Sequence, residues 1–175
     1  MNSRTDVLLI YPYFHREPGY RKLWLFPPTG LGYLAGVMQK NGIKIRILDG
    51  TFMKSDELIR QAKMLSPGIV GIYCMVTMRD EARGIARDLN TLPNKPFLVA
   101  GGPLPTSEPG MFLEEFDAIV LGEGEKTMLE LVQGYLAGDD LSVIKGIALI
   151  KNGKIESTSR REYIDNIDSI PHPPA

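Results

Sequence analysis

The stretch that decides the fold is Val7-Leu8-Leu9-Ile10-Tyr11, a run of apolar residues that no charged residue interrupts. Such a run predicts a β-strand covered on both faces, which is typical of parallel sheets. Four further strands are predicted along the chain, at 43–48, 69–74, 96–100 and 118–121. Helical segments separate all five, so we predict an α/β fold with a doubly wound, five-stranded parallel sheet.

The second strand is expected at an edge of this sheet. Ile43-Lys44-Ile45-Arg46-Ile47-Leu48 alternates apolar and basic residues, which indicates one exposed face. An edge position favours the flavodoxin-like strand order 2-1-3-4-5. Ligands of such sheets bind beyond the carboxyl ends of the strands, beside strand one. The loops that start at Pro12, Met75, Gly101 and Gly122 are therefore the candidate ligand-binding loops.

Beyond residue 140 the alternation of strands and helices stops. Two short runs, 144–150 and 154–159, flank Asn152-Gly153, a dipeptide typical of tight hairpin turns. We therefore assign residues 1–140 to the α/β domain and 141–160 to an appended β-hairpin. Residues 161–175 are assigned to a linker, because the proline-rich end of the chain favours extended backbone.

Composition excludes several classes of function. A net charge of -1 and a pI of about 6.1 provide no electrostatic basis for binding nucleic acid. No apolar run approaches the roughly 20 residues needed to cross a bilayer, and residues 1–6 are too polar for a signal peptide. The lone Cys74 is typical of a reducing compartment, so we expect a cytoplasmic protein, and one thiolate cannot hold an iron–sulfur cluster. His15 and His172 lie in proline-rich loops, where we expect them in solvent, and no metal-ligand spacing is present.

The candidate loops have no pattern that identifies a reaction. Gly101-Gly102 permits close approach of a ligand, but such a pair is also typical of a tight turn. Gly122-Glu123-Gly124-Glu125 follows the fifth strand rather than the first, so it is no dinucleotide fingerprint. Its two glutamates are expected to stabilise the start of the next helix, because the helix dipole favours acidic side chains there. Thr77 is expected to cap a helix, and Cys74 to be a small buried side chain.

Taken in order, the chain resembles the N-terminal cobalamin-binding domain of B12-dependent radical S-adenosylmethionine enzymes, such as the anaerobic Mg-protoporphyrin monomethyl ester cyclase type and many methylases. The segments that carry the resemblance span nearly the whole chain: Val7-Leu8-Leu9-Ile10-Tyr11-Pro12, Pro27-Pro28-Thr29-Gly30-Leu31-Gly32-Tyr33-Leu34-Ala35, Gly101-Gly102-Pro103, Gly122-Glu123-Gly124-Glu125, Asn152-Gly153 and Ile167-Asp168-Ser169-Ile170-Pro171-His172-Pro173. The last segment is similar to the one that leads into the family's radical domain.

The resemblance implies a corrinoid that lies over the strand ends, bound by a domain that does not catalyse alone. The positions that match the family's cofactor contacts are Pro28, Thr29, Met75, Val76, Thr77, Gly101, Gly102, Pro103, Gly122 and Glu123. Among them, Gly101, Gly102 and Pro103 would pack against the tail of the cobalamin. S-adenosylmethionine and a [4Fe-4S] cluster would belong to a downstream domain of the same polypeptide, because the C-x-x-x-C-x-x-C motif is not in this chain. Whole enzymes of the family are methyltransferases or oxidative cyclases.

Two motifs depart from those of related cobalamin domains. Domains that bind cobalt through a histidine carry D-x-H-x-x-G after strand one, whereas Tyr13 and Pro18 stand at the Asp and Gly positions around His15. His15 is therefore not expected to bind cobalt. Relatives often have a histidine after Gly-Gly-Pro, where this chain has Leu104.

Three alternatives stay open. A scaffold domain of the same fold would dock the radical domain without a cofactor, with Trp24, Phe26 or Leu104 filling the corrinoid space. A flavodoxin-like domain would hold a flavin, but the loop after strand one lacks a short Ser/Thr-rich turn for its phosphate. A response-regulator-like switch would need an Asp at the end of strand three, where Cys74 stands.

Overall fold

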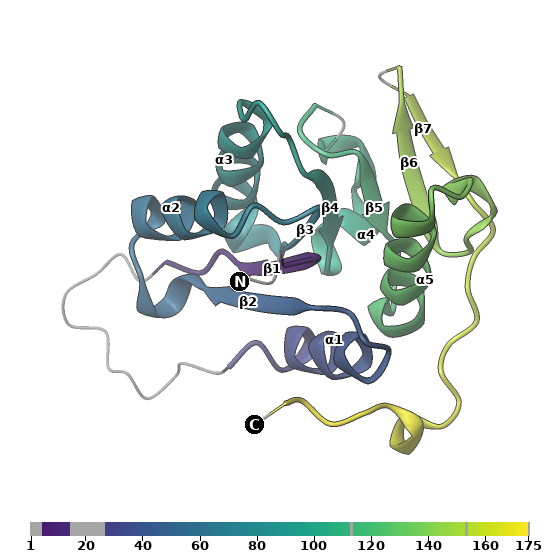
Figure 1. Ribbon diagram of the computed structural model, residues 1–175. Coiled ribbons are helices and arrows are strands. Elements are labelled where there is room, and N and C mark those ends of the chain that lie inside the picture. The colour runs from purple at the N-terminus through teal and green to yellow at the C-terminus, as the bar shows by residue number, and fades with distance from the viewer. Residues whose placement is uncertain (1–4, 15–26, 113, 153, 175) are drawn as a thin grey trace.

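The computed structural model describes residues 5–14, 27–112, 114–152 and 154–174. In this part of the chain, one seven-stranded sheet has the order β2-β1-β3-β4-β5-β6-β7 and helices on both faces (Figure 1). The strands are β1 (Val7–Tyr11), β2 (Ile45–Asp49), β3 (Ile69–Tyr73), β4 (Phe97–Gly101), β5 (Ala118–Val120), β6 (Ile147–Lys151) and β7 (Lys154–Ser157). The α-helices are α1 (Thr29–Lys40), α2 (Ser55–Leu65), α3 (Arg79–Asn90), α4 (Pro103–Ser107) and α5 (Gly124–Ala137). Short 3-10 helices are η2 (Gly50–Phe52), η3 (Val76–Met78), η4 (Pro109–Phe112), η5 (Leu141–Val143) and η6 (Ile167–Ser169).

The parallel part of the sheet has the predicted order. Strand β1 lies between β2 and β3, and its Val7 pairs with Ile45 of β2 on one side and with Ile69 of β3 on the other. Strands β4 and β5 continue the parallel ladder. Within the described residues β2 pairs with β1 alone, so the edge position inferred from its alternating pattern is confirmed.

The prediction of five strands is wrong, because the hairpin adds two strands to the same sheet. Strand β6 pairs antiparallel with β5 through Ile119 and Ala148, and β7 pairs with β6, which extends the same sheet to seven strands. The physical reason lies in the burial of β6: Ile147 and Ala148 are fully buried. An unpaired β5 would also leave a row of open N–H and C=O groups at the sheet edge.

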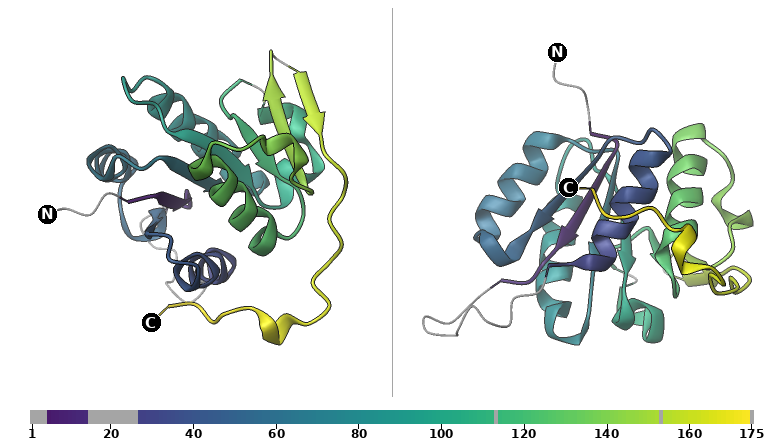
Figure 2. Two further views of the ribbon diagram at one scale, coloured as in Figure 1. Left: turned by 45° about the vertical axis from the view of Figure 1, so that its right-hand side comes forward. Right: turned by 90° about the horizontal axis from the view of Figure 1, so that it is seen from below.

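The sheet separates two hydrophobic cores, one on each face. Successive side chains of a strand point to opposite faces, and in β1 Leu8 and Ile10 join the core under α2 and α3. Val7 and Leu9 join the core under α1 and α5. The view from below in Figure 2 shows α1 and α5 side by side on one face of the sheet. These two helices therefore define the face that carries the candidate site described below.

Local sequence signals explain most helix ends, with one exception. Gly42 follows α1 with a φ of +75°, and Ser66 ends α2 in the left-handed region with a φ of 43°. The prediction that Thr77 caps a helix is wrong: Thr77 lies inside η3, and α3 begins two residues later without a side-chain cap. The 3-10 turn at the end of β3 displaces the helix start along the chain.

None of the helices in the described ranges is both long and apolar enough to cross a membrane.

Candidate cofactor site

A narrow, apolar cleft opens at the carboxyl ends of the strands, between α1, α5 and the sheet. We call this cleft the slot. Its apolar side chains are Leu9, Leu31, Leu34, Val99, Val120 and Met128. Its glycines are Gly30, Gly71, Gly101, Gly102, Gly122 and Gly124. Ile72, Tyr73 and the acidic Glu125 also line the slot.

The glycines of the slot fall into two kinds. Gly71 and Gly124 are needed for packing: a Cβ on Gly71 would lie 2.8 Å from Leu9 Cδ2, and one on Gly124 would lie 3.2 Å from Leu34 Cδ2. Gly30 and Gly101 face open space instead. A Cβ on Gly30 would meet nothing within 4 Å, and one on Gly101 would meet only Val120 Cβ, at 4.0 Å.

The backbone conformation does not account for glycine at these two open positions either, because neither Gly30 nor Gly101 has a positive φ. Their missing side chains leave room for another molecule at the mouth of the slot. A ligand at this place would require such open space.

Gly102 is required by its own geometry. Its φ of +107° disfavours other residues, and a Cβ there would lie 2.8 Å from Cys74 O and 3.0 Å from Tyr73 Cε2. Thr106 connects this turn to the next loop, since its Oγ1 donates to Gly102 O (2.9 Å) and accepts from Gly122 N (3.1 Å). The loops after β3, β4 and β5 are thus fixed against one another around the slot.

At the end of β3, the titratable side chains near the slot are uncharged at neutral pH. Burial raises the pKa of the Cys74 thiol to about 12, so this fully buried side chain stays protonated. Burial also raises the pKa values of Tyr11 and Tyr73. Their rings pack 5.6 Å apart, tilted by 41°, as a neutral aromatic wall. Over the described ranges, no three His, Cys, Asp or Glu side chains are placed to hold a metal ion.

The structure brings all ten predicted site residues to the carboxyl ends of β1, β3, β4 and β5. Only Gly101, Gly102 and Gly122 line the slot itself. The others surround its mouth: Pro28 and Thr29 lie at the start of α1, Met75, Val76 and Thr77 follow β3, Pro103 begins α4, and Glu123 is the N-cap residue of α5. Their exposure differs, and Val76 is 74% exposed.

Sequence reasoning missed the deeper residues of the slot. Gly71 could have been noticed, because an isolated glycine in a strand often marks a close approach. Leu34 and Met128 carry no such signal, since their proximity depends on how α1 and α5 pack.

Of the positions named for the scaffold alternative, Leu104 is 7% exposed and packs in the core on the opposite face. Trp24, Phe26 and His15 lie outside the described residues. His172 is exposed, as expected.

Fold and site together define a doubly wound α/β domain with a cleft at the carboxyl ends of its strands, where such domains bind ligands. The model of one protein family, the B12 binding domain, matches residues 25–132. The chain belongs to this family of B12-binding domains. Membership confirms the resemblance seen in the sequence and cobalamin as the cofactor, and it decides against the flavin and response-regulator alternatives.

Curated relatives agree with this assignment. An uncharacterized methyltransferase of Pyrococcus horikoshii is 34% identical over 152 residues, which cover 84% of this chain and 33% of that protein. The anaerobic magnesium-protoporphyrin IX monomethyl ester cyclase of Cereibacter sphaeroides is 27% identical, over 94% of this chain and 28% of that protein. The chain thus spans about a third of the length of such relatives.

Solved structures share the fold. The radical S-adenosylmethionine methyltransferase TsrM from Kitasatospora setae, determined with cobalamin and a [4Fe-4S] cluster, has a TM-score of 0.76 at 22% identity, over 97% of this chain and 31% of that one. The cobalamin-dependent S-adenosylmethionine radical enzyme OxsB, determined with aqua-cobalamin and S-adenosylmethionine, has a TM-score of 0.78 at 17% identity, over 97% and 24% of the two chains.

The residues of the slot are compatible with part of a cobalamin. The slot encloses about 150 Å³, below the roughly 300–1,000 Å³ of pockets that enclose a drug-sized ligand. It can therefore receive only a flat, mostly apolar portion of a cofactor as large as cobalamin. The open glycines at its mouth leave room for the remainder over the strand ends.

Proposed function

We propose that this chain is the cobalamin-binding part of a radical S-adenosylmethionine enzyme, with the tail of the cobalamin in the slot and the corrin over the strand ends. The observation that carries the proposal is the pair of open glycines, Gly30 and Gly101. Neither conformation nor packing requires a glycine at these places. Both glycines border the slot, unlike the equally open Gly84, and room for a ligand there is the reason that we propose for them.

The ten predicted residues divide into two groups in this proposal. Gly101, Gly102, Pro103 and Gly122 contact the tail, where the absence of bulky side chains permits close packing. The remaining residues border the corrin: Pro28, Thr29, Met75, Val76, Thr77 and Glu123. The large exposure of Val76 supports this role, because an apolar side chain at the mouth can be covered by the apolar face of a ligand.

The reaction belongs to a longer protein. Bound cobalamin supplies the capacity to carry and transfer a methyl group or to take part in radical chemistry. The relatives' greater length supports a following radical domain in the same polypeptide, reached through the linker 161–175 after the α/β domain and its hairpin. That domain would hold S-adenosylmethionine and the [4Fe-4S] cluster. The full enzyme would be a cytoplasmic methyltransferase or oxidative cyclase, consistent with one buried free thiol.

A hydroxocobalamin titration of the 175-residue chain, followed by visible absorbance and calorimetry, tests the proposal. Gly30→Leu places a side chain at the mouth of the slot. Gly84→Leu is a matched control, because Gly84 is also in a helix, also has nothing within 4 Å of its Cβ position, and lies in α3 on the other face. We expect one-to-one binding that Gly30→Leu weakens at least tenfold and Gly84→Leu leaves unchanged.

The same titration separates this proposal from the scaffold alternative. A folded chain that does not bind hydroxocobalamin at high micromolar concentration would contradict the proposed function and favour a docking domain that uses no cofactor. Equal weakening by both leucine variants would show that the slot is not the binding site.

A further inference from the structure

The C-terminal segment crosses the open side of the molecule from α5 to α1. We call residues 160–174 the strap. It is extended apart from the 3-10 turn η6, and Figures 1 and 2 show it passing from the hairpin, around the outside, to the surface of α1. The strap therefore connects the two helices that form the walls of the slot.

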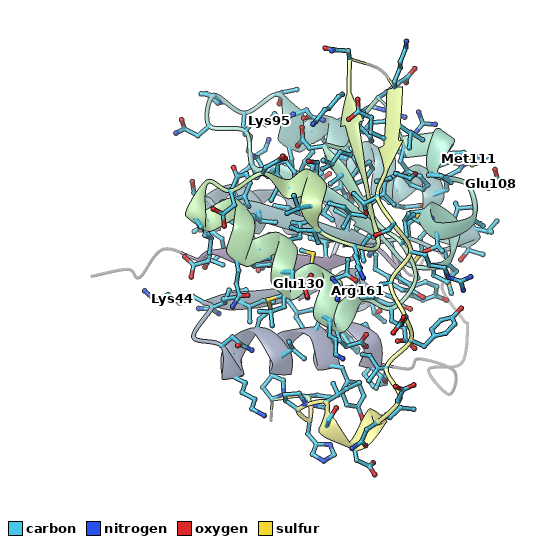
Figure 3. All side chains as sticks on the ribbon, turned by 90° about the vertical axis from the view of Figure 1, so that its right-hand side faces the viewer. Lys44, Lys95, Glu108, Met111, Glu130 and Arg161 are labelled. Atoms are coloured by element: carbon cyan, nitrogen blue, oxygen red, sulfur yellow. The ribbon has the colours of Figure 1, made fainter. Side chains whose placement is uncertain are left out.

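The first attachment of the strap is to α5. Arg161 forms an ion pair with Glu130, with Nη1 donating to Oε1 at 3.1 Å and a second contact from Nη2 to Oε2. Figure 3 shows these two side chains next to each other. The guanidinium also donates to Lys145 O (3.3 Å), and the Arg161 side chain is only 17% exposed. Further along, Ile164 N donates to Glu123 Oε2 (2.8 Å) at the start of α5.

The second attachment is to α1, through two of its glycines. A Cβ on Gly36 would lie 2.4 Å from His172 O and 3.1 Å from Pro171 O, and these strap atoms are the nearest to it. A Cβ on Gly32 would lie 3.1 Å from Pro173 Cβ. Glycine inside a helix is less favourable than alanine. Close contact with the strap is what these glycines provide in return.

The attachments lie on opposite walls of the slot. Helix α1 contributes Leu31 and Leu34 to it, and α5 contributes Gly124 and Met128. The two helices meet where Leu34 faces Gly124. A motion that separates α1 from α5 widens the slot and moves the two attachments of the strap apart.

We propose that the strap is a clamp: by joining α1 to α5 it holds the walls of the slot together and slows the release of a bound cobalamin. This inference rests on the proposed function, because it assumes that the slot holds the tail of the cofactor. It adds a role for residues that do not line the slot. The clamp acts on the rate of opening, so its main effect is on the dissociation rate of the ligand.

The path of the strap adds a second consequence. From His172 at Gly36 to Pro173 at Gly32, the strap runs along α1 toward the helix start, where Gly30 borders the slot. The chain thus approaches the mouth of the slot on the outside of α1. The second attachment therefore lies within two residues of Gly30 along α1.

The test uses Gly36→Ala, whose new methyl group cannot coexist with the strap in its present position. Gly84→Ala is the matched control, since both changes put alanine into a helix and only the first meets the strap. The first readout needs no cofactor: trypsin cleavage after Arg160 and Arg161, which an attached strap protects. The second is the dissociation rate of hydroxocobalamin from the 175-residue chain, followed by visible absorbance.

We expect Gly36→Ala to raise both rates about tenfold, equivalent to about 1.4 kcal/mol in the barrier, and Gly84→Ala to leave both unchanged. Glu130→Ala, a substitution on an exposed face, should raise both rates by a smaller factor. This second variant tests the clamp even if Gly36→Ala misfolds. Unchanged cleavage in Gly36→Ala and Glu130→Ala would refute the clamp. Faster cleavage with wild-type dissociation rates would refute it too. Failure of the unaltered chain to bind hydroxocobalamin would instead refute the proposed function, whatever the protease result.

Discussion

Two arginines on α3 share one buried carboxylate, and removing each should have very different costs. Glu115 lies just before β5, and its side chain is 2% exposed. Arg83 Nε donates to both of its carboxylate oxygens at 3.0 Å, and Arg87 Nε donates to Oε1 at 3.1 Å. The Arg83 side chain is 25% exposed and that of Arg87 is 61% exposed. The hydrogen bond to Glu115 also raises the pKa of Arg83.

Burial sets the expected magnitudes. Breaking a buried ion pair by removing one partner costs about 3–5 kcal/mol, because a charge is left without compensation. Since Arg87 would remain, Arg83→Met should reduce the free energy of unfolding by about 2–3 kcal/mol. Arg87→Met removes a mostly hydrated pair and should cost less than about 1 kcal/mol. Methionine retains most of the alkyl stem in both variants, so lost packing contributes little to the difference.

Urea unfolding of both variants, followed by circular dichroism, measures the difference directly. The midpoint should fall clearly in Arg83→Met and only slightly in Arg87→Met, with an unchanged slope. Equal costs for the two variants would refute the reasoning, because it derives the whole difference from the exposure of the two side chains. A changed slope would mean that the substitution has altered the compactness of the native or the unfolded state, and not only one ion pair.

Three further results are expected. Gly101→Val should weaken hydroxocobalamin binding at least tenfold while Gly110→Val, also in open space but outside the slot, should not; equal affinities would place the ligand elsewhere. The free energy of unfolding in urea should fall as pH rises from 9 toward 12, because burial raises the pKa of the Cys74 thiol from 9.0 to about 12 and the thiol's contribution to stability is therefore complete below pH 9 and lost above it; Cys74→Ala should show a smaller fall, and an equal fall in both proteins would contradict the raised pKa. Ile147→Ala should lower the free energy of unfolding by about 2–4 kcal/mol in urea, since Ile147 is fully buried against the sheet, whereas a cost near zero would show that the hairpin is a separate appendage.

The sequence predicted the parallel core of the fold because its signals are local. Uninterrupted apolar runs mark buried strands, and the alternation over residues 43–48 marks an edge strand, as found for β2. The hairpin was recognised from Asn152-Gly153, but not its union with β5. Nothing in residues 144–159 specifies which edge a hairpin covers, because pairing of β5 with β6 depends on the positions of elements distant in the sequence.

The candidate site was predicted at its rim and missed in its depth. Glycine pairs at strand ends, such as Gly101-Gly102, are visible because they interrupt a pattern. Leu34 and Met128 resemble any other core residue of an amphipathic helix, and their role follows from the distance between α1 and α5. The cap assigned to Thr77 was wrong because a 3-10 turn of three residues leaves no clear periodicity in the sequence.

Neighbouring side chains of β1 point to opposite faces of the sheet and therefore have different roles. Leu9 borders the slot, whereas its neighbours Leu8 and Ile10 belong to the core beneath α2 and α3. Saturation mutagenesis of this strand should therefore yield a period of two, in which even positions affect protein abundance and Leu9 affects cofactor loading as well. The core beneath α2 and α3 can therefore be redesigned for thermal stability without changing the side chains that line the slot.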